Sequence, residues 1–272
     1  MSIVFAAVVP HPPIIVPEIG KGEEKKIEKT TQAYEKLSRE LAAAKPDTII
    51  FITPHTLLYP DMFNVCGMEK LKGNFHDFGF PEYHFVVENN ISLANEIVDQ
   101  SETEGIASLL YDNDADYYLD HGVMVPLYFF NKYLKKNVGI LPIGYTYGSR
   151  AEHYMFGQIL SEVCGRRNER IAVIASGDLS HHLLEPEIDG ENIGLQFDKK
   201  IIKLIKDNDE KGIIKLDQAL IERAGECGYK SILVLLGAVS DLAYESEVYS
   251  YEGPFGVGYL VANLQIDKQL EL

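Results

Sequence analysis

The chain has 272 residues, of which 46% are apolar, enough for a sizeable core without disulfides, and its three cysteines form no C-x-x-C pair. Its formal charge of −16, with lysine and arginine only in short pieces, excludes nucleic acid as an expected partner. A signal peptide and a long apolar run are both missing from the sequence, so we expect no membrane association and a cytoplasmic location.

The N-terminal third predicts two buried strands, each ending at a histidine. Residues 3–9 form a continuous β-prone run that breaks at Pro10-His11-Pro12-Pro13, because prolines cannot continue a strand ladder. Residues 23–44 carry apolar side chains at helical spacing and predict a helix, which Pro46 stops. Residues 48–53 then predict the second strand, which ends at Pro54-His55.

Helices and strands continue to alternate along the rest of the chain. We expect helices at residues 92–104, 123–134, 150–166, 194–207 and 231–243, and strands at 107–110, 137–142 and 170–175. Residues 246–252 and 257–264 predict a closing hairpin. This alternation predicts an α/β fold, with a mostly parallel central sheet flanked by helices on both faces. Nothing in the sequence resembles a linker or a repeat, so we expect a single domain over residues 1–272.

Three of the eight histidines occupy the same type of position. His11, His55 and His181 each follow a predicted strand. Ligands of open α/β sheets bind outside the carboxyl ends of the strands, so these imidazoles can converge although they are far apart in sequence. A lone histidine is more often a structural residue, but three at equivalent positions indicate a metal site or an acid/base site at this edge.

Two histidines and a carboxylate form the arrangement that leaves positions at Fe(II) open for substrate and O2. The candidate carboxylate is Glu226, just ahead of the helix expected at 231–243, where its ordinary alternative role is to interact with the helix dipole. Cys227 is a rival ligand, because a thiolate also binds such metals. Asp178 is another candidate carboxylate, although we expect it to orient His181 or to cap the following turn.

The remaining histidines divide into one candidate and several ordinary residues. His121 starts a helix and could donate a hydrogen bond to a substrate oxygen, or simply pack locally. His76 and His84 lie in an aromatic segment that we expect to be a surface loop. The G-x-S-x-G, H-E-x-x-H and dinucleotide-binding motifs are all missing from the sequence, which argues against serine hydrolases and nicotinamide enzymes.

Four motifs in order carry a resemblance to a known superfamily. They are Val-Pro-His11-Pro-Pro, Thr-Pro-His55, Asp-His121-Gly followed by Val-Pro-Leu, and Ser-Gly-Asp-Leu-Ser-His181. Over nearly the whole chain they resemble the class III extradiol ring-cleavage dioxygenases, catalytic B-subunit type. The segments Glu226-Cys-Gly and Tyr-Glu-Gly-Pro-Phe-Gly-Val-Gly-Tyr259 look most like the dioxygenase-like domain of the AmmeMemoRadiSam system proteins, relatives of the Memo proteins.

The resemblance implies roles for five residues. It makes His11 and His55 iron ligands, Glu226 the carboxylate ligand, His181 the catalytic base and acid, and His121 a contact to substrate oxygen. It implies Fe(II) as the metal, with zinc or another divalent ion as the alternative, and a small catechol-like aromatic substrate together with O2. In Memo-like relatives a cysteine takes the place near Glu226, so Cys227 stays open as the ligand.

Two other functions stay open at this point. One is a Memo-like metal-binding or protein-interaction module without ring cleavage, and the other is a metal-dependent hydrolase. A homodimer is the expected assembly, because cyclic dimers are the commonest closed form. The resemblance also allows an AMMECR1-type domain in relatives.

Overall fold

One eight-stranded sheet forms the centre of the computed structural model, which describes residues 2–112, 118–135, 137–186 and 192–267. The strand order is β6-β3-β7-β2-β8-β1-β10-β9. The strands are β1 (Ile3–Val9), β2 (Thr48–Thr53), β3 (Phe63–Cys66), β6 (Ser108–Tyr111), β7 (Gly139–Gly144), β8 (Ile171–Ser176), β9 (Tyr244–Glu252) and β10 (Tyr259–Ile266).

The middle of this sheet is parallel and the margins are mixed. Strand β8 lies between β2 and β1 and pairs in parallel with both, and β2 also pairs in parallel with β7. Strand β3 is antiparallel to β7, and the hairpin β9–β10 joins the sheet through an antiparallel pairing of β10 with β1. The mostly parallel sheet and the closing hairpin predicted from the sequence are therefore confirmed.

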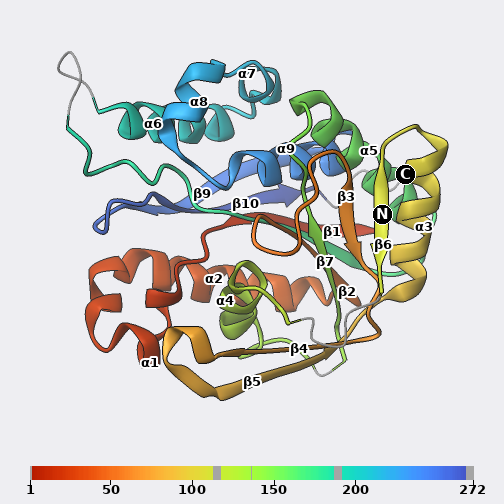
Figure 1. Ribbon diagram of the computed structural model, residues 1–272, viewed down its shortest axis with the longest axis horizontal. Coiled ribbons are helices and arrows are strands. Elements are labelled where there is room, and N and C mark those ends of the chain that lie inside the picture. The colour runs from red at the N-terminus through yellow and green to blue at the C-terminus, as the bar shows by residue number, and fades with distance from the viewer. Residues whose placement is uncertain (1, 113–117, 136, 187–191, 268–272) are drawn as a thin grey trace.

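Helices cover both faces of the sheet, as Figure 1 shows. One face carries α3 (Ile91–Thr103), α5 (Arg150–Gly165), α6 (Ile193–Lys206) and α9 (Tyr229–Val239), with the short helices α7 (Glu210–Ile214) and α8 (Gln218–Ala224) outside α6. The other face carries α2 (Glu28–Ala44) and α4 (His121–Phe130), near α1 (Pro17–Gly20) and the hairpin β4 (Lys70–Phe75) and β5 (Phe80–Glu88). In the described ranges, no helix combines the length and apolarity needed to cross a bilayer.

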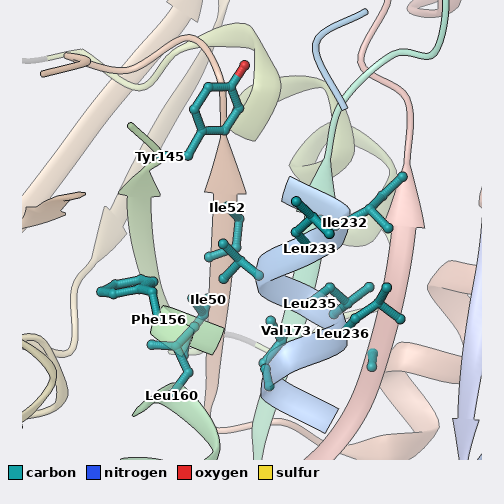
Figure 2. Close-up of a cluster of buried hydrophobic side chains, with 14 of the residues drawn as sticks. Ile50, Ile52, Tyr145, Phe156, Leu160, Val173, Ile232, Leu233, Leu235 and Leu236 are labelled. Atoms are coloured by element: carbon teal, nitrogen blue, oxygen red, sulfur yellow. The ribbon is translucent and has the colours of Figure 1, made fainter. Parts of the chain in front are cut away.

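Each face of the sheet has its own apolar core, because successive side chains of a strand point to opposite faces. Ile50, Ile52 and Val173 pack against the α5 and α9 side (Figure 2). Ile49 and Phe51, in the same strand, join the core on the α2 and α4 side. Strands buried on both faces read as continuous apolar runs, which is why β1, β2 and β8 were the segments best predicted from the sequence.

The structure corrects three local predictions. The helix expected at 123–134, with His121 at its start, runs from His121 to Phe130 and so ends four residues early; Asp120 caps its start by accepting a hydrogen bond from Gly122 N. The helix expected at 23–44 starts with a 3-10 turn, Glu23–Ile27, ahead of α2. The aromatic segment around residues 75–84 was expected as a surface loop. That was wrong: it is the β4–β5 hairpin, and Phe75 is buried in the core beside α4.

Candidate metal centre

Three donor atoms from distant segments meet at the carboxyl ends of the central strands. His11 follows β1, His55 follows β2, and Cys227 lies in the loop between α8 and α9. The Nε2 atoms of His11 and His55 are 3.0 Å apart, and Cys227 Sγ lies 3.6 Å from His11 Nε2. All three donor atoms lie within 4.8 Å of one another. The strands that place the two histidines flank β8, so the site sits over the middle of the sheet.

These spacings fit the ligand sphere of one transition-metal ion. Imidazole nitrogens bind such an ion at about 2.1 Å and a thiolate sulfur binds at about 2.3 Å. Two nitrogens at roughly right angles around an ion stand about 3.0 Å apart, and a nitrogen and a sulfur at a tetrahedral angle stand about 3.6 Å apart. The observed separations of 3.0 and 3.6 Å are of this size, and the third pair, His55 and Cys227, lies within 4.8 Å. The donor set therefore fits a borderline ion such as iron, zinc or copper.

His11 is held in the tautomer that a metal ligand needs. Its Nδ1 lies 2.9 Å from Ser176 Oγ, at the end of β8, and that hydroxyl donates its own proton to Gly122 O at 2.5 Å. Because the hydroxyl proton is used on the carbonyl, Ser176 accepts the hydrogen bond from His11 Nδ1–H. The lone pair of Nε2 is then free and points toward His55 and Cys227.

Asp178 links His11 to Cys227. From the sequence we expected Asp178 to orient His181 or to cap the following turn. In the structure its carboxylate Oδ1 accepts the backbone N–H of His11 at 2.9 Å. The backbone N–H of Asp178 donates to Cys227 Sγ at 3.2 Å, and its carbonyl accepts the N–H of Gly228 at 2.9 Å. Asp178 is therefore a residue that positions two donors.

A glycine contact brings the cysteine loop to the end of β8. A Cβ on Gly177 would lie 2.1 Å from the Cα of Gly228. The chain therefore approaches itself at this point more closely than any side chain permits. Since Gly228 follows Cys227 directly, this contact fixes how near the thiol lies to His11.

His121 and His181 complete a cluster of four imidazoles. The ring of His121 stacks on that of His55 with centroids 4.1 Å apart, and meets the His11 ring edge-on at 5.1 Å. Phe78, in the turn between β4 and β5, meets the His121 ring edge-on, with the ring centroids 5.4 Å apart. His181 is exposed and lies close enough to lower the pKa values of His11 and His55.

Burial keeps the cluster uncharged. It lowers the pKa of His11 well below 6.5 and that of His55 to about 4, with the neighbouring imidazoles adding to the effect. Burial also lowers the pKa of His121, and partial desolvation together with the neighbouring His182 lowers that of His181 although part of its side chain is exposed. Neutral imidazole is the form that binds metals and accepts protons. The pKa of the Cys227 thiol is raised well above its usual value by burial and by Asp178, and a bound cation opposes that effect by favouring the thiolate.

Glu226 occupies a different position from the donor group. Its carboxylate Oε2 accepts the backbone N–H of Tyr229 at 2.5 Å, at the start of α9. Burial raises the pKa of Glu226 to about 7, while that hydrogen bond and the nearby Lys230 act in the opposite direction. In this conformation Glu226 interacts with the helix N-terminus, the ordinary role weighed for it from the sequence. Its role as a metal ligand stays a prediction.

A second network, which the sequence did not reveal, supports His55. The hydroxyl of Thr53 donates to Asp120 Oδ1 at 2.7 Å and accepts the backbone N–H of His55 at 3.3 Å. The same carboxylate caps α4, so one buried group links the loops of His55 and His121. Burial raises the pKa of Asp120 to about 6. Two sequence features could have revealed this network: Thr53 at the end of a strand and Asp120 at the start of a helix.

With this geometry established, comparisons with known proteins decide the family. Residues 5–262 match the family model described as the catalytic LigB subunit of aromatic ring-opening dioxygenase. The chain belongs to this family. The family is that of the class III extradiol dioxygenases, as the four histidine motifs indicated.

Two curated relatives are similar to the chain. The chain is 40% identical over 272 residues to Protein CA_C1420 of Clostridium acetobutylicum, covering 97% of this chain and 58% of the relative. It therefore spans less than two thirds of that relative's length. It is 21% identical over 231 residues to 3,4-dihydroxyphenylacetate 2,3-dioxygenase of Escherichia coli, covering 80% of this chain and 82% of that enzyme.

One solved structure shows the same fold. It is an uncharacterized protein, JW3007, from Escherichia coli K12, with a TM-score of 0.60 over 96% of this chain and 99% of that chain. The two sequences are 15% identical, so the likeness concerns the fold alone.

Proposed function

We propose that this LigB-family chain is a non-haem Fe(II)-dependent extradiol-type dioxygenase that opens a catechol-like ring with O2. The observation that carries the proposal is the group of His11, His55 and Cys227 donors, within 4.8 Å of one another at the carboxyl ends of the central strands. Imidazole ligands suit iron. Similarity to a 3,4-dihydroxyphenylacetate 2,3-dioxygenase supports a catechol as the substrate class.

In this proposal His11 and His55 hold the ion, and the third ligand is either Cys227 or Glu226. The distance from Cys227 Sγ to His11 favours the cysteine, while Glu226 would have to give up its hydrogen bond to Tyr229 N. A bound Fe(II) ion would lower the pKa of a coordinated phenol and bring it together with O2.

His181 and His121 act on the substrate's protons. Both have lowered pKa values, so both are neutral at neutral pH and can accept a proton. We assign His181 the role of the base that removes a phenolic proton and later returns it. His121, whose ring contacts His55 and Phe78, donates a hydrogen bond to a substrate oxygen.

A second candidate is a Memo-like metal-binding module that does not cleave rings. The observation that favours it is that Cys227, and not Glu226, lies among the donors. A soft thiolate suits zinc or copper as well as iron, so the same site could hold a metal for another purpose. Four expectations from the sequence remain predictions: a homodimer, a cytoplasmic location, a single domain over residues 1–272, and an AMMECR1-type domain in relatives.

The deciding experiment is metal analysis followed by a turnover assay. The protein is purified without air, its metal is measured, and Fe(II)-loaded protein is mixed with a catechol panel, including 3,4-dihydroxyphenylacetate, and O2. We expect a yellow ring-opened product and matching oxygen uptake. If fully iron-loaded protein turns over no catechol, the dioxygenase proposal is contradicted. Hydrolytic activity with zinc and without O2 would indicate a metal-dependent hydrolase.

Two variants separate the candidate third ligands. We expect Cys227→Ala to lose the bound metal and Glu226→Gln to retain it, because the thiol already lies beside His11. His181→Gln serves as the matched control: it should keep the metal and lose turnover. If Glu226→Gln loses the metal while Cys227→Ala keeps it, the carboxylate is the ligand and the loop must rearrange on binding.

A further inference from the structure

A hollow lined by lysines lies at the β9 edge of the sheet and shares no residue with the metal donors. Its volume is about 730 Å³, and its lining comes from α6, the start of α2 and β9. The lysines that line it are Lys29 from α2 and Lys199, Lys203 and Lys206 from α6. The dioxygenase proposal uses none of these residues.

The hollow lies against the free edge of the sheet. Strand β9 ends the strand order and pairs with β10 on one side only in the described part of the chain. Four consecutive residues of β9, residues 248–251, line the hollow, although their side chains alternate between the two faces. Helix α2 approaches from one face and α6 from the other, so the hollow exposes the strand edge itself. A bulge at Tyr249, where the register shifts, adds to the irregularity of this edge.

The hollow is positively charged although the chain as a whole is acidic. The chain carries a net charge of −16, yet Asp207 is the acidic side chain in the described lining, and it pairs with Lys203. Within the described residues, Lys29, Lys199 and Lys206 have no carboxylate partner. Their charges are therefore available to an anionic ligand.

One buried hydroxyl of β9 also borders the hollow. Ser250 is 7% exposed, and its Oγ has no hydrogen-bond partner among the described residues. Ser250 pairs with Val261, which belongs to the core on the α2 side, so its side chain faces α2 and not the lysines of α6. The hydroxyls of its neighbours Tyr249 and Tyr251 are already used, on Glu40 and Asp198.

The spacing of the charges favours an extended occupant over a compact anion. Lys199, Lys203 and Lys206 are spaced four and three residues apart on one face of α6, which spreads them over roughly 10 Å of helix. Donors that grip a single phosphate converge on one point, whereas these form a row. In an extended peptide the side chains on one face recur about every 7 Å, close to this spacing.

We propose that this hollow binds an acidic peptide segment in extended conformation, which adds to the edge of β9. Main-chain groups of β9 would pair with the peptide backbone, while the lysine row would pair with its carboxylates. The complementarity between an acidic peptide and this basic hollow argues for that partner rather than a second copy of an acidic chain. The alternative role for edge lysines is to prevent strands from pairing at all.

The test uses the full chain and a fluorescein-labelled peptide of alternating glutamate and valine, read by fluorescence anisotropy. We expect binding that weakens with salt, and a loss of at least about tenfold in affinity for the double variant Lys199→Glu, Lys206→Glu. Lys200→Glu is the matched control for Lys199→Glu alone, because both make the same charge change on α6 and only Lys199 lines the hollow. A peptide N-methylated at alternate amides should bind at least about tenfold more weakly, because it cannot pair with the edge.

Three results would overturn the proposal. The first is no binding by the wild-type chain, which would indicate that the lysines only prevent other strands from pairing with β9. The second is equal binding of the methylated and unmethylated peptides with displacement by inorganic phosphate, which indicates a small-anion site. The third is an equal effect of Lys200→Glu and of Lys199→Glu, which indicates general electrostatic attraction. Circular dichroism of each variant confirms that it folds.

Discussion

At the scale of single residues, Ser176 decides whether His11 can serve as a ligand. Its hydroxyl accepts the proton of His11 Nδ1 and is itself fixed by Gly122 O. We expect Ser176→Ala to weaken metal affinity by about 10- to 100-fold, the usual effect of removing a group that orients a ligand. Competition with a metal-binding dye measures it. Ser38→Ala is the control, because Ser38 is equally buried but bonds Tyr34 O in α2; an equal loss there would contradict the assigned role.

Asp198 gives a prediction about pH. Its buried carboxylate accepts the N–H of Ser180 and the hydroxyl of Tyr251, and burial raises its pKa from 3.8 to about 6. The folded protein therefore holds this proton more tightly than the unfolded chain does. The contribution of Asp198 to stability falls as the pH rises from about 4 to about 6, and is constant above that range.

We expect Asp198→Asn to remove this dependence while keeping the hydrogen bond from Ser180 N to the amide oxygen; the amide nitrogen then donates to the Tyr251 hydroxyl, which reverses that bond. Relative to Asp198→Asn, the wild type should lose up to about 3 kcal/mol of unfolding free energy across that range. Urea unfolding of both proteins at a series of pH values measures the difference. A difference that does not change with pH would show that the carboxyl titrates normally.

At the scale of elements, α5 and α9 cross with their backbones in contact. A Cβ on Gly157 would lie 2.1 Å from Val234 O, and one on Gly237 would lie 2.0 Å from Tyr154 O. We expect Gly157→Ala to destabilise the fold by about 1 to 3 kcal/mol or more, because the helices must separate. Gly165→Ala, at the end of α5, meets nothing within 4 Å and should be neutral or slightly stabilising in thermal denaturation. Equal effects of the two substitutions would contradict a tight crossing.

How far the sequence predicts the site depends on what each element contributes. His11 and His55 were predictable because each follows a strand buried on both faces, and such strands are recognisable as apolar runs. The nearness of Cys227 was not, because it depends on the contact between Gly177 and Gly228, residues from different elements. The β4–β5 hairpin escaped prediction because its strands mix charged residues with a few buried aromatics, a pattern shared with loops.

At the scale of the whole molecule, metal binding should increase the free energy of unfolding. Only the folded chain brings the donors together, so a metal at about 100 times its dissociation constant adds about 2.7 kcal/mol to the unfolding free energy. We expect the melting temperature of chelator-treated protein to rise on addition of Fe(II) without air, or of zinc. The rise should vanish in His11→Ala. An equal rise in that variant would place the metal elsewhere.

The position of β1 has a consequence for biosynthesis. Strand β1 lies between β8 and β10, whose residues follow it by more than 160 and more than 250 positions. Strand β1 has both neighbours only after β10 has been made, and contacts so distant in sequence slow folding. Until then the apolar residues of β1 are exposed to solvent, so we expect the nascent chain to depend on chaperones.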